Sequence, residues 1–252
     1  MESIGIVVPN YNGARYLEAA LQSIVDQRYP ALRCHVADGG SRDDSLSIIR
    51  RFADVHPWLT FDSGPDGGQA AAIAAGFARL PTDLVGWLNS DDELCAGALE
   101  RIARAADACP DVVLFHGDVD RIDEQGNVIG RTTSRDLTWE EMRRGRCRTV
   151  QPGSFYRRWA VEAAGSVDPS YHLLMDVDLW IRLTRLGPST RIPATLARFR
   201  VHEAAKSSQA PWKYYRETLR LAFAHQRDRL PRALMERGWQ IVKHQARARL
   251  EG

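Results

Sequence analysis

The sequence has few cysteines and no pattern among them. Cys34, Cys95, Cys109 and Cys147 form no CxxC pair within the 252 residues, which argues against a zinc site or a disulfide framework. No apolar run approaches the roughly 18 residues needed to cross a bilayer. The opening segment MESIGIVVPNYNG lacks a basic region and a small-residue cleavage site and is interpreted as a first strand. We therefore expect a soluble cytoplasmic protein.

The two classical nucleotide-binding fingerprints are also missing. Neither GxGxxG nor GxxxxGKS occurs, and the first of these absences disfavours a dehydrogenase. The net charge is only +2, although residues 211–252 carry 10 Lys and Arg against 4 Asp and Glu. No nucleic-acid-reading motif accompanies this basic charge, so we expect no nucleic-acid partner.

Apolar runs alternate with helical periodicity along the first 108 residues. Strands are predicted at 4–8, 33–37, 59–62 and 84–88, and helices at 14–27, 45–52, 69–80 and 96–108. This alternation predicts an α/β fold with a doubly wound, mostly parallel sheet and helices on both faces.

The second half of the sequence has a different pattern. Segments 112–123 and 128–132 flank the turn EQGN and predict a small antiparallel element, while 173–186 has the apolar spacing of a helix. Segment 214–250 also has helical spacing, broken at Pro231. These C-terminal helices either pack on the core or hold a basic face against the cytoplasmic surface of an anionic membrane, as a peripheral contact.

Polar residues follow the strand predicted at 84–88, beginning with Asn89, Ser90, Asp91 and Asp92. Carboxylates at a strand end suit a hard divalent ion, and a nucleotide diphosphate would supply the remaining oxygens. Such an ion would neutralise charge that builds on a leaving diphosphate. The alternative is that these residues only cap a helix starting near Leu94.

Glycine-containing turns follow the strands predicted at 33–37 and 59–62. Asp38 precedes a Gly-Gly-Ser turn, where a carboxylate can accept a hydrogen bond from a nucleobase and glycines allow close approach of the backbone. The alternative is a simple turn before a helix capped by Asp43 or Asp44. Segment 64–69 places glycines at a helix N-terminus, where they can face phosphate.

Two further segments carry candidate chemistry. Asp176 and Asp178 lie two apart in MDVDLW and would diverge by about 200° on a helix, so only one faces a cleft. That carboxylate can act as a general base, or can simply favour the helix N-terminus. In RFRVHEAAKSS, His202 can ligate a metal while Lys206 and Ser207 hold diphosphate oxygens; a solvated basic loop is the alternative.

Read together, seven segments resemble glycosyltransferase family 2 over about residues 4–208: VVPNYNG, VADGGSRDDS, GPDGGQAAAIAAGF, WLNSDDEL, QPGSFYRR, MDVDLWIRL and FRVHEAAKSS. The resemblance implies a GT-A (Rossmann-like) domain at 1–210, with a nucleotide-binding half at about 1–110 and an acceptor and catalytic half at about 111–210. A basic helical extension follows at 211–252. It also implies an inverting transferase that moves a sugar from a nucleotide-diphosphate sugar to a hydroxyl acceptor.

The resemblance assigns roles by position. It implies nucleotide or donor contacts for Pro9, Tyr11, Asn12, Asp38, Gly68, Gln69, Asn89, Ser90, Asp91, Lys206 and Ser207. It implies a divalent cation, Mg²⁺ or Mn²⁺, at Asp91, Asp92 and His202. Asp176 matches the catalytic base, and Asp178 is left to support the start of its helix.

The substrates implied are a UDP-sugar, with GDP- or dTDP-sugars as alternatives, and a saccharide or lipid-linked acceptor of polysaccharide, glycolipid or other glycoconjugate biosynthesis. The sequence departs from the family pattern at Asn89, where an acidic residue is usual, and at Ala71 and Ala74, where an acid and an amide are usual. A non-catalytic nucleotide-sugar-binding protein and a nucleotidyltransferase are the alternative functions.

Overall fold

The computed structural model describes residues 1–135, 137–143, 149–202 and 211–225. The strands are β1 (Ile4–Asn10), β2 (Leu32–Asp38), β3 (Leu59–Ser63), β4 (Leu84–Trp87), β5 (Glu93–Leu94), β6 (Leu114–Ile122), β7 (Val128–Thr132), β8 (Ser154–Arg157) and β9 (Ser189–Arg200). The helices are α1 (Ala14–Val25), α2 (Ser45–Val55), α3 (Gln69–Arg79), α4 (Ala98–Ala108), α5 (Trp139–Arg143), the 3₁₀ turn η1 (Gln151–Gly153), α6 (Arg158–Ala163), α7 (Met175–Leu183) and α9 (Pro211–His225).

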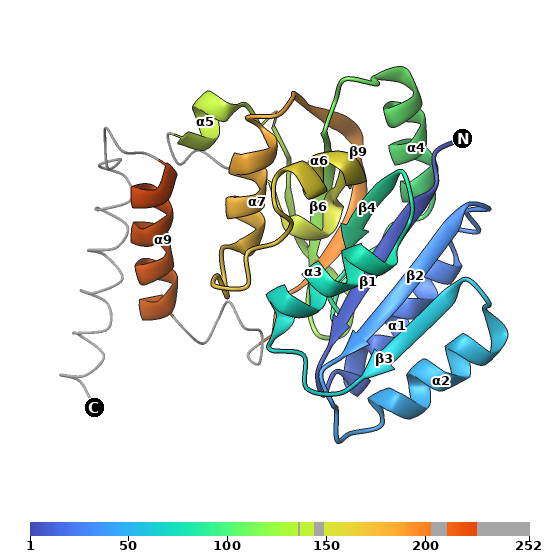
Figure 1. Cartoon of the computed structure of the whole chain (residues 1–252). Helices are drawn as coiled ribbons and strands as arrows, with labels where there is room; N and C mark the ends of the chain where they lie inside the picture. Colours follow the sequence, from blue (N-terminus) through green and yellow to red (C-terminus); the bar gives the residue numbers. More distant parts are fainter. Residues whose placement is uncertain (136, 144–148, 203–210, 226–252) are drawn as a thin grey trace.

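The first half of the chain forms the parallel part of one sheet (Figure 1). Strands β3, β2, β1 and β4 lie side by side in that order, and each neighbouring pair is parallel. The central strands β1 and β4 are buried along their whole length, as expected for parallel strands with both faces covered, whereas β3 at the end of the sheet is buried only at Leu59. The predicted doubly wound, mostly parallel α/β arrangement is confirmed.

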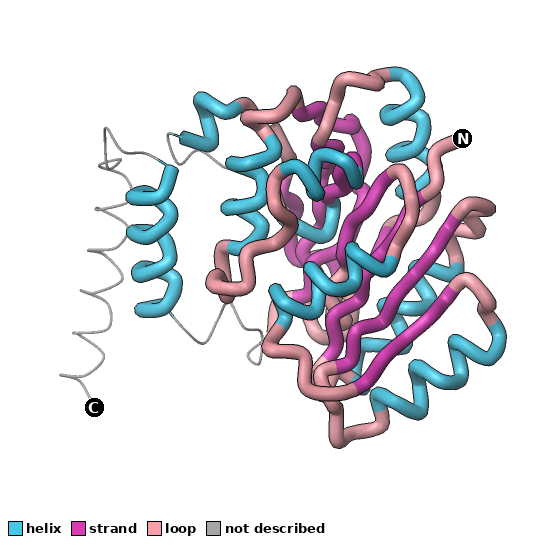
Figure 2. Tube along the Cα trace, viewed as in Figure 1, coloured by secondary structure: helices cyan, strands magenta, loops and turns pink. Residues whose placement is uncertain are grey.

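Helices cover both faces of the sheet, as Figure 2 shows. Alternate residues of β1 point to opposite faces: Ile4 and Ile6 join a core cluster with Leu17 of α1 and Leu99 of α4. Val7 joins a second cluster with residues of α3, α6, α7 and α9. The sheet therefore separates two apolar layers. The loops between strands and helices lie at the strand ends.

The second half adds antiparallel strands to the same sheet. Strand β8 lies antiparallel to both β4 and β6, and β6 and β7 form the predicted hairpin. Strand β9 runs parallel to β6, and the short β5 pairs antiparallel with β9. This last pairing brings the segment after β4 next to the end of β9. The alternative that residues 89–92 only cap a helix starting near Leu94 is wrong, because Leu94 lies in β5. The helix predicted at 96–108 is α4, which begins at Ala98.

The described part of the C-terminal extension packs on the core. Helix α9 lies beside α7 in Figure 1, and its Leu221 and Ala222 are buried. Of the two alternatives that the sequence left open, α9 shows packing on the core. The break at Pro231 and the rest of the predicted helix fall outside the described residues. Across the described ranges, none of the helices has the length and apolar character needed to cross a membrane.

Candidate active site

Polar side chains meet where the parallel strands end. Strands β1 and β2 end at Asn10 and Asp38, which lie opposite each other in the register, and β3 ends beside them at Ser63. The Asp38 carboxylate accepts hydrogen bonds from Asn10 Nδ2, Ser63 Oγ and both the backbone N–H and hydroxyl of Ser41. These donors fill the roughly four acceptor positions of a carboxylate. Asp38 is only 2% exposed and is therefore occupied in holding three loops together.

The ionisation of Asp38 follows from these contacts. Burial by itself would raise the pKa of Asp38. The hydrogen bonds from Ser41, Ser63 and Asn10 together outweigh burial and hold the pKa of this carboxyl below its usual range. The strand-end loops thus contain a fixed negative charge over the physiological pH range.

The segment after β1 presents one free aromatic ring. Tyr11 is 65% exposed, whereas Pro9 is buried within β1 opposite Ala37. The backbone N–H of Asn12 donates to Ser41 Oγ at 2.8 Å, and Asn12 Oδ1 accepts from the N–H of Arg42 at 2.8 Å. Asn12 therefore joins two loops, and the exposed ring of Tyr11 beside it is open to a ligand. Pro9 is buried in the strand, and its expected contact with a nucleoside stays a prediction.

The glycine turn before α3 has a backbone that other residues rarely adopt. Gly67 and Gly68 have φ angles of 78° and 105°, which lie in the region that favours glycine. Asp66 Oδ1 accepts the N–H of Gly68 at 2.8 Å and so stabilises the turn. Gln69 then begins α3, and its Nε2 donates to Asn89 Oδ1 at 2.8 Å. The turn is thereby connected to the segment that follows β4.

In the segment that follows β4, Asp92 is fully buried. Its carboxylate is 0% exposed and accepts hydrogen bonds from the N–H of Arg200 at 3.0 Å and from Asn89 Nδ2 at 3.1 Å. Burial, and secondly the charge of Asp91, raise the pKa of Asp92 well above its usual value. This geometry differs from the expected metal-ligand role of Asp92, because both oxygens face protein donors.

Asp91 and His202 come together from distant parts of the sequence. Asp91 Oδ2 lies 3.0 Å from His202 Nε2, and Asp91 is partly exposed. The His202 ring packs against the ring of Tyr16, with centroids 5.2 Å apart. Ser90 precedes Asp91 and is also partly exposed, close to Gly13 of the segment after β1. The pair thus lies at the edge of the sheet where the strand-end loops meet.

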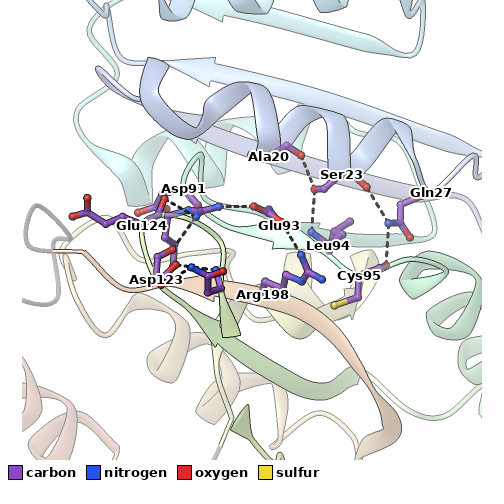
Figure 3. Close-up of polar contacts among 12 residues, drawn as sticks. Ala20, Ser23, Gln27, Asp91, Glu93, Leu94, Cys95, Asp123, Glu124 and Arg198 are labelled. Carbon is purple, nitrogen blue, oxygen red and sulfur yellow. Dashed lines mark hydrogen bonds and ion pairs between the residues drawn. The ribbon is translucent and has the colours of Figure 1, made fainter. Parts of the chain in front are cut away.

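A buried arginine holds this region in place, and the sequence analysis did not single it out. Arg200 is 3% exposed, and its Nε donates to the backbone carbonyl of Asp91 at 3.0 Å. Its Nη1 donates to the carbonyl of Asp123 at 2.9 Å, and its Nη2 pairs with the Glu93 carboxylate. Figure 3 shows Asp91 and Glu93 beside Asp123 of the β6–β7 turn. Arg200 therefore joins the Asp91 segment, β5 and that turn.

The two carboxylates of α7 have different surroundings, as their spacing predicts. Asp178 is buried and pairs with Arg182 Nη2 at 2.6 Å and with His225 Nε2 at 2.8 Å. Asp176 is partly buried, and its Oδ1 accepts the N–H of Val177 at 2.8 Å. Burial raises the pKa of Asp176 to about 6, and the charge of Glu217 adds to this effect. A carboxyl with such a pKa is able to accept a proton near neutral pH.

Two residues expected at the site, Lys206 and Ser207, lie outside the described residues. The structure brings the other candidates into three groups: Asp38 with the loops after β1 and β3, Asn89 with Gln69 and Asp92, and Asp91 with His202. Asp176 contributes a separate carboxylate from α7.

Comparison with known proteins identifies relatives across most of the chain. Residues 5–174 match the sequence model of Glycosyl transferase family 2. An uncharacterised glycosyltransferase of Nostoc sp. is 28% identical over 210 residues, which cover 80% of this chain and 65% of that protein. The chondroitin synthase of Pasteurella multocida is 23% identical over 187 residues, covering 73% of this chain but only 19% of the synthase. The chain thus spans less than two thirds of the length of these relatives.

Solved structures share the fold. Staphylococcus aureus TarS 1-349, in complex with UDP-GlcNAc, superposes with a TM-score of 0.72 and 16% identity, covering 95% of this chain and 71% of that one. The mannosyltransferase PcManGT from Pyrobaculum calidifontis, in complex with GDP-Man and Mn²⁺, gives a TM-score of 0.67 at 16% identity and covers 95% and 68% of the two chains. The match of the family model over most of the sequence, together with this common GT-A architecture, shows that the chain belongs to glycosyltransferase family 2.

Proposed function

We propose that this chain is a metal-dependent, inverting glycosyltransferase that uses a nucleotide-diphosphate sugar. The observation that carries the proposal is the Asp91–His202 pair, 3.0 Å apart, at the edge of the sheet where the loops after β1, β3 and β4 meet. An α/β sheet binds ligands at this edge. Asp176, with its raised pKa, supplies a separate carboxylate for proton transfer.

The residues present fit a divalent cation. Asp91 offers a carboxylate oxygen and His202 an imidazole nitrogen, which suit Mn²⁺, while Mg²⁺ prefers oxygen ligands. Across the described segments, no three His, Cys, Asp or Glu side chains are grouped to hold an ion. Two protein ligands are sufficient for an ion that takes its other ligands from substrate phosphates and water. When bound, such an ion would stabilise the negative charge of the leaving diphosphate.

The chemical step itself needs one protein side chain, a base. Asp176 accepts the proton of the acceptor hydroxyl, whose oxygen forms a bond to the anomeric carbon of the donor. The bond between that carbon and the diphosphate oxygen breaks, and the nucleotide diphosphate leaves from the opposite side. One base is sufficient for this inverting displacement, and no protein nucleophile is needed. Retaining glycoside hydrolases, by contrast, use two carboxyl groups flanking the scissile bond.

The nucleotide would be held by the strand-end loops. Tyr11 offers an exposed ring on which a base can stack, and Gln69, Asn89 and Ser90 line the neighbouring segments. We assign Asp38 and Asp92 to positioning these loops, because the Asp38 carboxylate is filled by four protein donors and that of Asp92 is fully buried and bonded to two. Direct contact of Lys206 and Ser207 with the diphosphate stays a prediction.

The proposed donor is a UDP-sugar, with a GDP- or dTDP-sugar as the alternative. The TarS and PcManGT structures contain UDP-GlcNAc and GDP-Man with Mn²⁺, respectively, which supports a nucleotide-sugar donor. The chondroitin and hyaluronan synthases among the relatives support an acceptor in polysaccharide or other glycoconjugate biosynthesis. A lipid-linked acceptor, a cytoplasmic location and peripheral membrane contact stay predictions.

The test is a calorimetric titration with UDP-, GDP- and dTDP-sugars and their nucleoside diphosphates, in Mn²⁺ and in EDTA. The proteins are the wild type, Asp91→Ala and the control Asp107→Ala, which removes an exposed carboxylate from the far end of α4. We expect one nucleotide class to bind only with metal, and this binding to be lost in Asp91→Ala alone. Equal binding by wild type and Asp91→Ala would contradict the proposed metal site. Binding without transfer to any acceptor would indicate a non-catalytic nucleotide-sugar-binding protein.

A further inference from the structure

The segment that leads into helix α7 is held by another helix. The first N–H groups of a helix have no partner within it, and Leu174, which precedes α7, makes no capping hydrogen bond with its own side chain. Glu217 of α9 instead binds the backbone of Leu174 and of the two residues before it. Its Oε1 accepts the N–H of His172 at 2.9 Å, and its Oε2 accepts those of Leu173 at 2.8 Å and Leu174 at 3.0 Å.

The setting makes these hydrogen bonds strong. Glu217 is only 7% exposed, and a carboxylate that accepts backbone N–H groups in a buried position makes charge-assisted bonds. Its negative charge is also favourable at the positive end of the α7 dipole. If the carboxylate were removed, three N–H groups would lose their acceptor, and that of Leu174 lies in a buried position. Glu217 therefore fixes the backbone of residues 172–174 directly before Met175.

A second contact holds helix α7 itself. His225, at the other end of α9, places Nε2 2.8 Å from Asp178 Oδ1, and both side chains are buried. Leu221, between Glu217 and His225, belongs to the same core cluster as Leu179. Helix α9 thus contacts the α7 segment both before and after Asp176.

We propose that Glu217 is a positioning residue for the transferase reaction, and that α9 is part of the catalytic unit because it fixes the helix start that carries Asp176. The inference rests on the proposed role of Asp176 as the base. It extends the functional unit past residue 174, where the match to the family sequence model ends. Glu217 does not need to touch the substrate, since it acts through the backbone of residues 172–174.

The pH profile of kcat/KM distinguishes this positioning role from a purely structural one, because it depends on the charge of Glu217. Glu217 raises the pKa of Asp176, in addition to the larger effect of burial. Tyr156 also interacts with Asp176, and its own pKa is raised far above neutrality, chiefly by burial, so that it stays protonated. Neutralising Glu217 therefore lowers the pKa of Asp176, and the acidic limb of kcat/KM moves to lower pH.

The experiment compares Glu217→Gln and Glu217→Ala with Arg216→Ala, an exposed neighbour on the same helix. Glutamine keeps the shape and one acceptor oxygen, so it serves if the alanine variant folds poorly. Steady-state kinetics over pH, donor titration and amide hydrogen exchange of residues 172–174 are measured on the full chain. A misplacement of about 1 Å costs on the order of 100-fold in rate, so we expect a kcat loss approaching this in Glu217→Ala. The loss should be smaller in Glu217→Gln and absent in Arg216→Ala.

The expected pattern also includes unchanged donor affinity, faster exchange of the three amides and an acidic limb at lower pH in Glu217→Gln. Wild-type kcat and an unmoved acidic limb in both Glu217 variants would overturn the inference, even if their stability fell. Asp176→Asn is assayed in parallel. Full activity of that variant would instead overturn the proposed function, so the two failures are distinguishable.

Discussion

Replacing Asp176 with asparagine should remove transfer and, at the same time, stabilise the protein above neutral pH. Asparagine keeps the size of the side chain and the oxygen that accepts the N–H of Val177, but it cannot take a proton from an acceptor hydroxyl. We therefore expect the variant to bind the donor normally and to turn it over no faster than the buffer blank. In the wild type, kcat/KM should rise with pH through about 6, because Asp176 must be ionised to act.

The gain in stability follows from the pKa of Asp176. Its pKa is raised from 3.8 to about 6, first by burial, so the folded state holds this proton more tightly than the unfolded chain does. The free energy of unfolding of the wild type therefore decreases as the pH rises from about 3.8 to about 6, and it stays lower above pH 6. A shift of about two units corresponds to roughly 3 kcal/mol. Because the side chain is partly exposed to screening solvent, we expect about 1–3 kcal/mol.

The assay is urea unfolding of the wild type and Asp176→Asn at pH 8 and again near pH 4, together with transferase activity. The free energy of unfolding should differ at pH 8, with the variant more stable, and should converge near pH 4. The matched control is Asp178→Asn on the same helix, which should destabilise the protein because it breaks the contacts with Arg182 and His225. An Asp176→Asn variant that is less stable than the wild type at pH 8, or that retains activity, would refute the reasoning.

Two further predictions concern Arg200 and the core. Arg200→Lys keeps the charge but loses the planar guanidinium group, whose Nε holds the backbone carbonyl of Asp91. We expect Mn²⁺ affinity to fall by about 10- to 100-fold, because groups that orient metal ligands have effects of this size. Isothermal titration with Mn²⁺ tests this against Arg198→Lys, and equal affinity in the two variants would argue against the role of Arg200. In Gly76→Ala, the new Cβ would lie 2.6 Å from the methyl carbons of Val7, so overpacking should cost about 1–3 kcal/mol. An unchanged urea midpoint would show that α3 can move away from β1.

Much of the fold was predictable because its signals are local. The apolar runs of β1 and β4 and the periodicity of α1 and α3 lie in short stretches of sequence, and each stretch determines its own element. The polar residues after each strand were also predictable, since parallel strands end at one edge of the sheet. The seven segments that resemble glycosyltransferase family 2 depend on this same local order, and the family is confirmed.

The sequence was less informative where one segment depends on another far along the chain. Strand β5 has only two residues and exists because β9 pairs with it, so the local sequence did not predict a strand at Leu94. The same pairing places the N–H of Arg200 on the Asp92 carboxylate. For this reason a residue that reads as a metal ligand is buried among protein donors.

The sequence by itself therefore determined the strand–helix order, the edge of the sheet where the candidate polar residues gather, and the family. Tertiary structure alone decided which carboxylates remain available there. Asp91 is left partly exposed beside His202, whereas Asp38 and Asp92 are buried and bonded to protein donors. The segment before Asp176 is held by Glu217 of α9. The physical reason is that burial and hydrogen-bond partners set the role of a carboxylate, and these partners come from strands and helices up to about a hundred residues away.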